Sequence, residues 1–302
     1  MVTMYSFIRY LLLLLGSYLV LPAQSVAGED LRWAGCDVTK RAFMAELAIA
    51  YEQLYGTRII MEGGGDLEGF RRISDNSAHI GGACRPKNTS DELEKNARAN
   101  PIAWDALVVM VHMDNPVNNI TLDQVRDLYE GRITNWKQLG GEDQPVELLV
   151  RQGKQSGVGH MIRELVFGDY DREFLASATF PSSDPLENAV ESNPNAVGVS
   201  GVSSAHDRDI KALALEGVEA SYDNIKNGKY LLHRPLYIIF NDSNPRREEI
   251  KQFLKLAHSA TGREIIRKHG VVPYLEASKL VLKQREQWDT ENTPTPAGRL
   301  LP

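Results

Sequence analysis

A glycine-rich loop carries the residues best suited to hold an anion. Arg151 opens the segment RQGKQSGVGHM, and a helix is predicted to begin near Val158. Small residues such as Ser156 and Gly157 let backbone N–H groups approach a ligand closely. An arginine guanidinium can bind an oxyanion through two parallel hydrogen bonds. The spacing predicts an anion-binding loop, with a plain turn between strand and helix as the alternative.

Four other loops of similar composition follow predicted strands. They are Gly35-Cys36-Asp37, Gly63 to Asp66, Ala83-Cys84-Arg85 and Ser182-Ser183. Ligands of open parallel sheets bind beyond the carboxyl ends of the strands. One such loop alone favours turn chemistry, but five together predict a shared anion site. Its further candidate residues are Asp66, Cys84, Arg85 and Ser183.

Alternating strands and helices must position these loops. We expect strands at Leu31 to Ala34, Arg58 to Met61 and His79 to Ala83, separated by helices at Lys40 to Tyr55 and Leu67 to Asp75. This βαβαβ order is typical of a parallel sheet covered by helices, and it places the chain in the α/β class.

The second half of the chain continues the pattern. Ile102 to His112 and Arg234 to Phe240 are long β-rich runs that could cross between two lobes. We also expect helices at Thr121 to Glu130, capped by Thr121, and at Pro185 to Ser192, capped by Asp184.

The net charge and the N-terminal residues narrow the class of protein. The 302 residues carry a formal net charge of −6, and no basic cluster suggests a nucleic-acid surface. Residues 1–27 resemble a cleavable signal peptide, with Arg9, an apolar run from Tyr10 to Leu21 and Ser25-Val26-Ala27 before the cleavage site. The chain is predicted to be a soluble exported protein of the periplasm.

The chain has two cysteines, Cys36 and Cys84, which follow the first and third predicted strands. An oxidising compartment permits a structural disulfide, which would stabilise the fold by about 4 kcal/mol in the chain-entropy model. A redox-sensitive gate is a second interpretation. A soft-metal site that adds His160 and Met161 is a third, but no tight ligand spacing predicts a metal. Ser156 could be imagined as a nucleophile, although QSGVG is not the Gly-x-Ser-x-Gly elbow, and no enzyme is predicted.

Several segments resemble the substrate-binding proteins of phosphate ABC transporters, the Pst-type periplasmic binding proteins. They are ITLDQVRDLYEGRITNWKQLGG, AHIGGACRP, NPNAVGVSG, RPLYIIFN and RQGKQSGV. The resemblance implies a two-lobed type II periplasmic binding protein fold, each lobe a mostly parallel sheet flanked by helices. We expect one lobe from 28–106 and 236–286, the other from 107–235, and a disordered tail at 287–302.

Carried over by position, the family's binding residues fall on Arg151, Ser156 and Gly157, and near Val38 with Thr39 beside it. The resemblance implies that a monomer captures a small oxyanion, most simply phosphate, without a cofactor or chemistry, for an ABC permease or a membrane sensor. The chain departs from the family pattern at Val38, Asp66, Cys84 and Val158. The resemblance implies that position 84 is that of the family's buried aspartate, which accepts a proton from hydrogen phosphate. These departures leave open another ligand, an organic anion or a metal, or a role in signalling or assembly.

Overall fold

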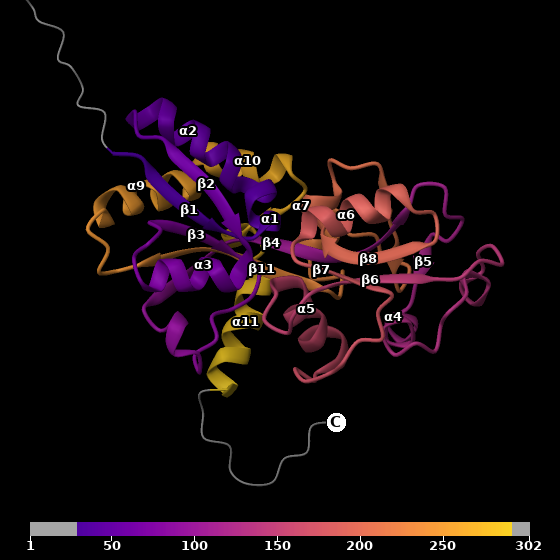
Figure 1. The fold of residues 1–302 in the computed structure, drawn as a ribbon. Helices are drawn as coiled ribbons and strands as arrows, with labels where there is room; N and C mark the ends of the chain where they lie inside the picture. The colour runs from indigo at the N-terminus through magenta and orange to yellow at the C-terminus, as the bar shows by residue number, and fades with distance from the viewer. Residues whose placement is uncertain (1–28, 292–302) are drawn as a thin grey trace, which may run out of the picture.

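The computed structural model describes residues 29–291 (Figure 1). The predicted signal peptide and residues 292–302 lie outside the described residues. No helix within the described range is both long and apolar enough to cross a membrane.

The first sheet lies at the left of Figure 1. Its parallel strands β2 (Ile59–Gly64), β1 (Leu31–Gly35) and β3 (Ile80–Ala83) are followed by the antiparallel β11 (His233–Asn241). Helix α3 (Gly65–Ser74) covers one face, and α2 (Ala45–Tyr55), α9 (Arg247–His258) and α10 (Ala260–Lys268) cover the other. The predicted βαβαβ order is confirmed. The expected helix from Lys40 to Tyr55 consists of a π-helical stretch, Lys40–Met44, followed by α2, and the short α1 (Asp37–Thr39) precedes it.

One long strand joins the first sheet to the second. β4 (Ala97–His112) pairs with β11 over Ala97 to Ala106 and with β8 (Ala196–Gly201) from Leu107 onward. Beyond β8 lie the parallel strands β6 (Glu147–Arg151) and β7 (Ala178–Phe180). The prediction of a two-lobed α/β fold is therefore confirmed (Figure 1). Of the two strands expected to cross between the lobes, only β4 pairs in both sheets, whereas β11 lies wholly in the first.

Helices of the second sheet follow the sequence signals with one correction. Thr121 caps α4 (Leu122–Tyr129), as predicted, and the structure adds a capping box with Gln124. The predicted Asp184 cap is wrong, because α6 (Ser183–Ser192) begins two residues before the predicted Pro185, with Ser182 at the cap position. Asp184 sits in the first turn, where a carboxylate is also favourable, and pairs with Arg41 at 2.7 Å.

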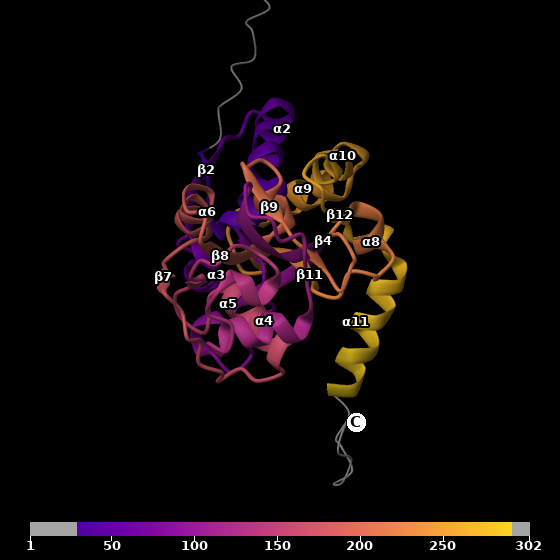
Figure 2. The same cartoon turned by 90° about the vertical axis from the view of Figure 1, so that its right-hand side faces the viewer.

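The remaining elements are short or peripheral. The helices are α5 (Gly157–Ile162), continued by a π-helical stretch at Arg163–Phe167, α7 (Val202–Ala205), α8 (Tyr222–Lys226) and α11 (Ser278–Glu291). The strands are β5 (Asn119–Ile120), β9 (Ile210–Ala212), β10 (Ala214–Leu215) and β12 (Val272–Pro273), and 3-10 turns occupy Glu92–Glu94, Trp136–Leu139 and Tyr274–Glu276. Figure 2 shows α11 on the same side as α8 and β12. Helix α11 reaches Glu291, so the segment expected to be disordered from residue 287 begins as a helix.

A buried ion pair ties β11 to β4. Arg234 on β11 donates from Nη2 to Asp105 Oδ2 on β4 at 3.1 Å, and both side chains are fully buried. Arg234 Nη1 also donates to the carbonyl of Cys84 at 3.2 Å. The pair thus ties the junction of the sheets to the loop that follows β3.

Candidate functional site

Two thiols and a carboxylate meet where the strands of the first sheet end. Cys36 follows β1, Asp66 lies in the first turn of α3, and Cys84 follows β3. One ligand atom of each, the two Sγ atoms and a carboxylate oxygen, all lie within 4.8 Å of one another, and all three residues are buried. We call these three residues the thiol–carboxylate cluster.

Hydrogen bonds fix the orientation of the Asp66 carboxylate. Its Oδ1 accepts the backbone N–H of Cys84 at 2.5 Å, and its Oδ2 accepts the Cys84 thiol at 3.5 Å. Burial first, and the hydrogen bond with Cys36 second, raise the pKa of the Cys84 thiol well above its ordinary value. Cys84 is therefore a neutral thiol that donates to a carboxylate at neutral pH.

The backbone turns that deliver these side chains depend on glycine. Gly63, Gly64 and Gly65 have φ values of 73°, 103° and 79°, in the left-handed region that other residues rarely adopt. This turn leads directly into α3 and points Asp66 at the end of β3. On the other side, Cys36 caps α1, and its Sγ lies 3.3 Å from Thr39 Oγ1.

A contact from the second sheet closes over the cluster. The backbone N–H of Gly157, at the start of α5, donates to Asp66 Oδ2 at 3.2 Å across 91 residues of sequence. A Cβ atom on Gly157 would lie 2.3 Å from Asp66 Oδ2 and 2.3 Å from Cys84 Sγ. Only glycine allows this approach, so the predicted candidates Gly157, Asp66 and Cys84 do meet.

Arg151 and Ser183 form a second group beside the first. Arg151 donates from Nη1 to Ser183 Oγ at 3.0 Å, from Nη2 to the Pro181 carbonyl at 2.7 Å and from Nε to the Phe180 carbonyl at 3.3 Å. The Ser183 N–H donates to Asp37 Oδ2 at 3.1 Å. Because Asp37 follows Cys36 directly, the start of α1 touches both groups.

The structure places two predicted site residues differently. Ser156 donates to the Gly153 carbonyl at 3.0 Å, within its own loop. Arg85 forms a buried ion pair with Glu94, at 2.5 Å between Nη2 and Oε1, and its Nε donates to the Gln155 carbonyl at 3.0 Å. Arg85 therefore holds the 152–157 loop in place rather than pointing at the cluster.

The predicted disulfide is absent from the structure, which has both cysteines as free thiols. Each sulfur has a hydrogen-bond partner of its own, Thr39 for Cys36 and Asp66 for Cys84. His160, weighed with Met161 as a metal ligand, instead lies 3.4 Å from Glu164 and faces the Tyr170 ring. Met161 is buried in the core.

Asp37, Asp105 and Arg234 support the site but were not among the predicted site residues. Asp105 carried a sequence signal, because it is a lone acid within the apolar run of β4. Burial raises the pKa of this carboxyl, and the charge of Arg234 opposes the rise. Asp37 had no such signal, since a carboxylate in a first helical turn is common.

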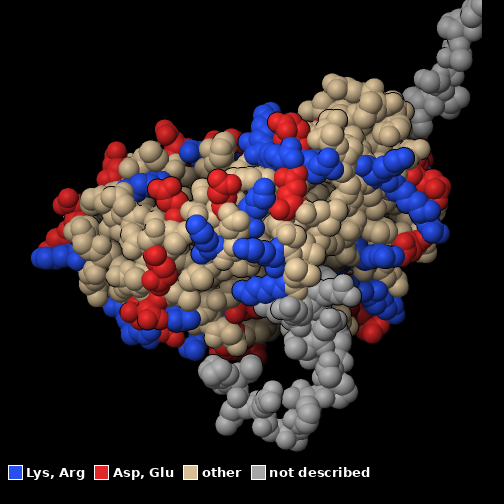
Figure 3. Space-filling model, turned by 180° about the vertical axis from the view of Figure 1, so that it is seen from behind, with Lys and Arg blue, Asp and Glu red and all other residues tan. Residues whose placement is uncertain are grey.

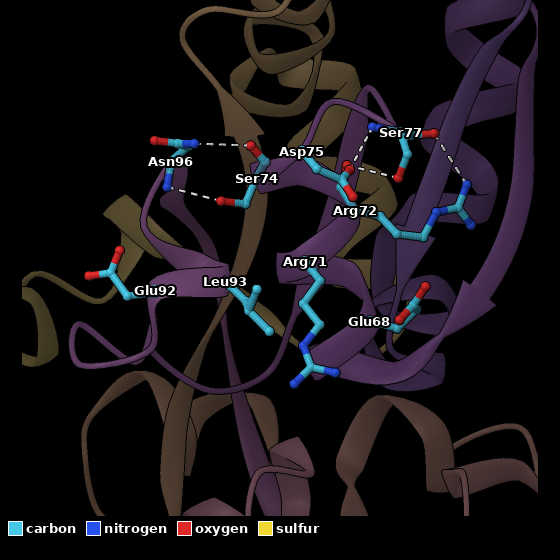
Figure 4. A pocket seen from close by; sticks show the side chains of 9 residues that line it. All are labelled: Glu68, Arg71, Arg72, Ser74, Asp75, Ser77, Glu92, Leu93 and Asn96. Atoms are coloured by element: carbon cyan, nitrogen blue, oxygen red, sulfur yellow. Dashed lines mark hydrogen bonds between the residues drawn. The ribbon is translucent and has the colours of Figure 1, made fainter.

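A surface pocket of about 510 Å³ lies away from these groups, between α3 and the 3-10 turn Glu92–Glu94. Figure 4 shows Arg71 extending from α3 between Leu93 and Glu68. Basic and acidic side chains line it together, so it has no single charge preference. On the face in Figure 3, Lys and Arg side chains likewise lie among Asp and Glu.

Two α/β sheets share the long strand β4, and strand-end loops of both meet at a buried contact. This arrangement defines a two-lobed binding-protein fold. Residues 25–261 match the model described as a PBP superfamily domain, so the chain belongs to the PBP superfamily.

The chain is similar to named relatives. The chain is 29% identical over 280 residues to "Phosphate-binding protein PstS" of Pseudomonas aeruginosa, covering 83% of this chain and 84% of that one. It is 23% identical over 269 residues to the protein of the same name from Borreliella burgdorferi, covering 86% and 96%.

A solved structure is similar over most of the chain. The putative phosphate ABC transporter substrate-binding protein of Clostridium perfringens, solved with bound phosphate, is 28% identical with a TM-score of 0.74. The match covers 81% of this chain and 99% of that one.

Proposed function

We propose that this protein captures phosphate between its two lobes in the periplasm and delivers it to the permease of an ABC transporter. The observation that carries the proposal is the meeting of strand-end loops from both sheets, at Asp66 and Gly157 and at Asp37 and Ser183, the latter held by Arg151. Backbone N–H groups, hydroxyls and one guanidinium suit an oxyanion. The phosphate-bound structure from Clostridium perfringens supports the choice of ligand.

Each residue has a proposed part in binding. Arg151 supplies the positive charge, and Ser183, Thr39 and the Gly157 N–H supply neutral donors. Asp66 accepts the proton of hydrogen phosphate, a role that the resemblance would give to position 84. The bond from the Cys84 N–H to Asp66 supports this exchange, because it sets the carboxylate directly beside position 84.

This arrangement has a consequence for selectivity. Phosphate keeps a proton at neutral pH and can donate it to a carboxylate, whereas sulfate has none to offer. A buried carboxylate that faces sulfate would be repelled without a compensating hydrogen bond. We therefore expect phosphate and arsenate to bind and sulfate to be rejected.

Ligand entry requires Gly157 to move away from Asp66. We propose that residues 28–106 and 236–286 form one lobe and 107–235 the other, and that the lobes open about β4 and β11. The change of partner along β4, from β11 at Ala106 to β8 at Leu107, supports a hinge at this place. The protein would act as an exported monomer, recognised by its permease when closed.

A calorimetric titration tests the proposal. The mature protein, stripped of ligand and kept in EDTA, should bind one phosphate and no sulfate. Arg151→Ala should weaken phosphate binding at least about 100-fold, because it removes charge-assisted hydrogen bonds. Arg132→Ala, which removes an exposed arginine with 59% side-chain exposure, is the matched control. A folded sample that gives no heat at millimolar phosphate would show that phosphate is not the ligand.

A further inference from the structure

We propose that the thiol–carboxylate cluster of Cys36, Asp66 and Cys84 is also a metal site that takes Zn²⁺. Within the described part of the chain it is the one group of three such side chains whose ligand atoms all lie within 4.8 Å, and each of its members is at most 4% exposed. Two thiolates and a carboxylate are a donor set that Zn²⁺ accepts, and thiolates also discriminate against Ca²⁺ and Mg²⁺.

The distances suit a tetrahedral ion. With Zn–S at about 2.3 Å and Zn–O at about 2.0 Å, tetrahedral angles require about 3.5 Å between sulfur and oxygen and about 3.8 Å between two sulfurs. The Cys84 Sγ and Asp66 Oδ2 atoms already lie 3.5 Å apart. The two sulfurs, at no more than 4.8 Å, need to approach by at most about an ångström.

The charged groups around the cluster do not oppose the binding of a cation. Arg234 is paired with Asp105, and Arg85 with Glu94, so both nearby guanidinium groups are already compensated. Among the described residues, no cation lies within ion-pair distance of Asp66, so its carboxylate brings a net negative charge to the cluster. A Zn²⁺ ion with two thiolates and this carboxylate totals −1, the same charge as the cluster now carries.

Zn²⁺ would replace the two thiol protons, and this replacement needs no oxidation or reduction. The Cys36 and Cys84 S–H bonds break, two Zn–S bonds form, and two protons leave to solvent. The backbone N–H groups of Cys84 and Gly157 continue to hold the Asp66 carboxylate, as outer hydrogen bonds commonly do around metal ligands. Three protein ligands leave a fourth position for water or an anion.

This site shares Asp66 and Cys84 with the proposed phosphate site but does not rest on it. Both ligands would enter through the same separation of Gly157 from Asp66. Phosphate binding in EDTA tests the transport function alone, and Zn²⁺ binding in phosphate-free buffer tests the metal site alone. A negative result in one of these two experiments therefore does not affect the interpretation of the other.

The test is a Zn²⁺ titration of the reduced, EDTA-stripped and desalted mature protein, in competition with a chromogenic chelator. We expect one Zn²⁺ per chain and a loss of affinity of at least about 100-fold in Cys36→Ser and Cys84→Ser. His269→Ala is the control, because His269 lies 2.9 Å from Glu46 and 3.6 Å from Asp207 in a competing surface group. Unchanged affinity in both serine variants, or loss in His269→Ala alone, would overturn the proposal.

Two measurements on the unaltered protein remain decisive if the serine variants do not fold. Co²⁺ should give the thiolate-to-metal absorption of a tetrahedral sulfur site, and equimolar Zn²⁺ should protect both thiols from a thiol reagent under mildly denaturing conditions. Co²⁺ without that absorption, or thiols that react equally with and without Zn²⁺, would refute a site built on Cys36 and Cys84.

Discussion

The Gly157 N–H donates to Asp66 Oδ2 at 3.2 Å and thereby joins the start of α5 to the first turn of α3. The two residues come from different sheets, and the contact excludes any side chain at position 157. The proposed closure of the lobes should therefore be sensitive to a single methyl group.

Gly157→Ala should weaken phosphate binding about 10- to 100-fold, because its Cβ would lie 2.3 Å from both Asp66 Oδ2 and Cys84 Sγ, and overpacking of this kind costs about 1–3 kcal/mol. Calorimetry gives the affinity, and thermal unfolding without ligand should change little. Gly153→Ala in the same loop is the control for backbone strain without a steric clash, since its φ of 78° disfavours alanine while its Cβ meets nothing within 4 Å. Equal losses in the two variants would assign the effect to loop strain.

Asp66→Asn should weaken phosphate binding and reduce the selectivity for phosphate over sulfate. The amide keeps the size of the carboxylate but removes its charge, so sulfate should gain measurable binding while phosphate loses about 10- to 100-fold, the value of a hydrogen bond to a charged group. Parallel titrations with the two anions check this. Unaltered rejection of sulfate would mean that another group enforces the selectivity.

Asp105→Ala should destabilise the fold by about 3–5 kcal/mol, because it leaves the buried Arg234 without its partner. Urea unfolding followed by circular dichroism measures the difference. The control is Asp242→Ala, which breaks an ion pair with Arg98 whose side chains are 58% and 68% exposed, and which should lie within about 1 kcal/mol of wild type. Similar losses in both variants would contradict a special role for the buried pair.

His233 should make stability fall in mild acid. Burial lowers the pKa of His233, which lies at the start of β11, with Nδ1 2.9 Å from the Tyr230 carbonyl. Below about pH 6.5 the unfolded chain binds a proton that the folded chain refuses, so stability is complete above that pH and is lost as the pH falls, by up to about 1.4 kcal/mol per unit.

His233→Asn can keep the donor to Tyr230 without titrating, and it should flatten this loss. The difference between the unfolding free energies at pH 7.5 and pH 5.5 measures this loss. His206→Asn is the control, because His206 is exposed. An acid dependence that is the same in His233→Asn as in wild type would exclude His233 as its cause.

Local signals predicted the fold well. The cap at Thr121 and the helix expected from Leu67 to Asp75 depend on residues close in sequence, and the structure has both. β4 begins at Ala97, five residues before the predicted Ile102, because its first residues gain their strand conformation from pairing with β11 and not from their own apolar pattern. Long-range pairing of this kind leaves no local trace.

The site was predictable only in part for the same reason. Loop composition identified Asp66, Cys84 and Gly157 as candidates for one site. Their contacts, however, depend on where the Gly63–Gly65 turn directs Asp66. Arg85 looked like a ligand because its partner Glu94, nine residues away, is an acid in a polar segment that gives no sign of burial.

The place of β11 also shapes how the chain must fold. β11 lies between β3 and β4, so these two strands cannot be joined through the sheet until residues His233–Asn241 have been synthesised. Until then each exposes an unpaired edge, and edges of this kind invite mispairing with other chains. A nascent or truncated chain that ends before His233 should therefore depend on a holding chaperone, and the first sheet should form late, as expected for contacts distant in sequence.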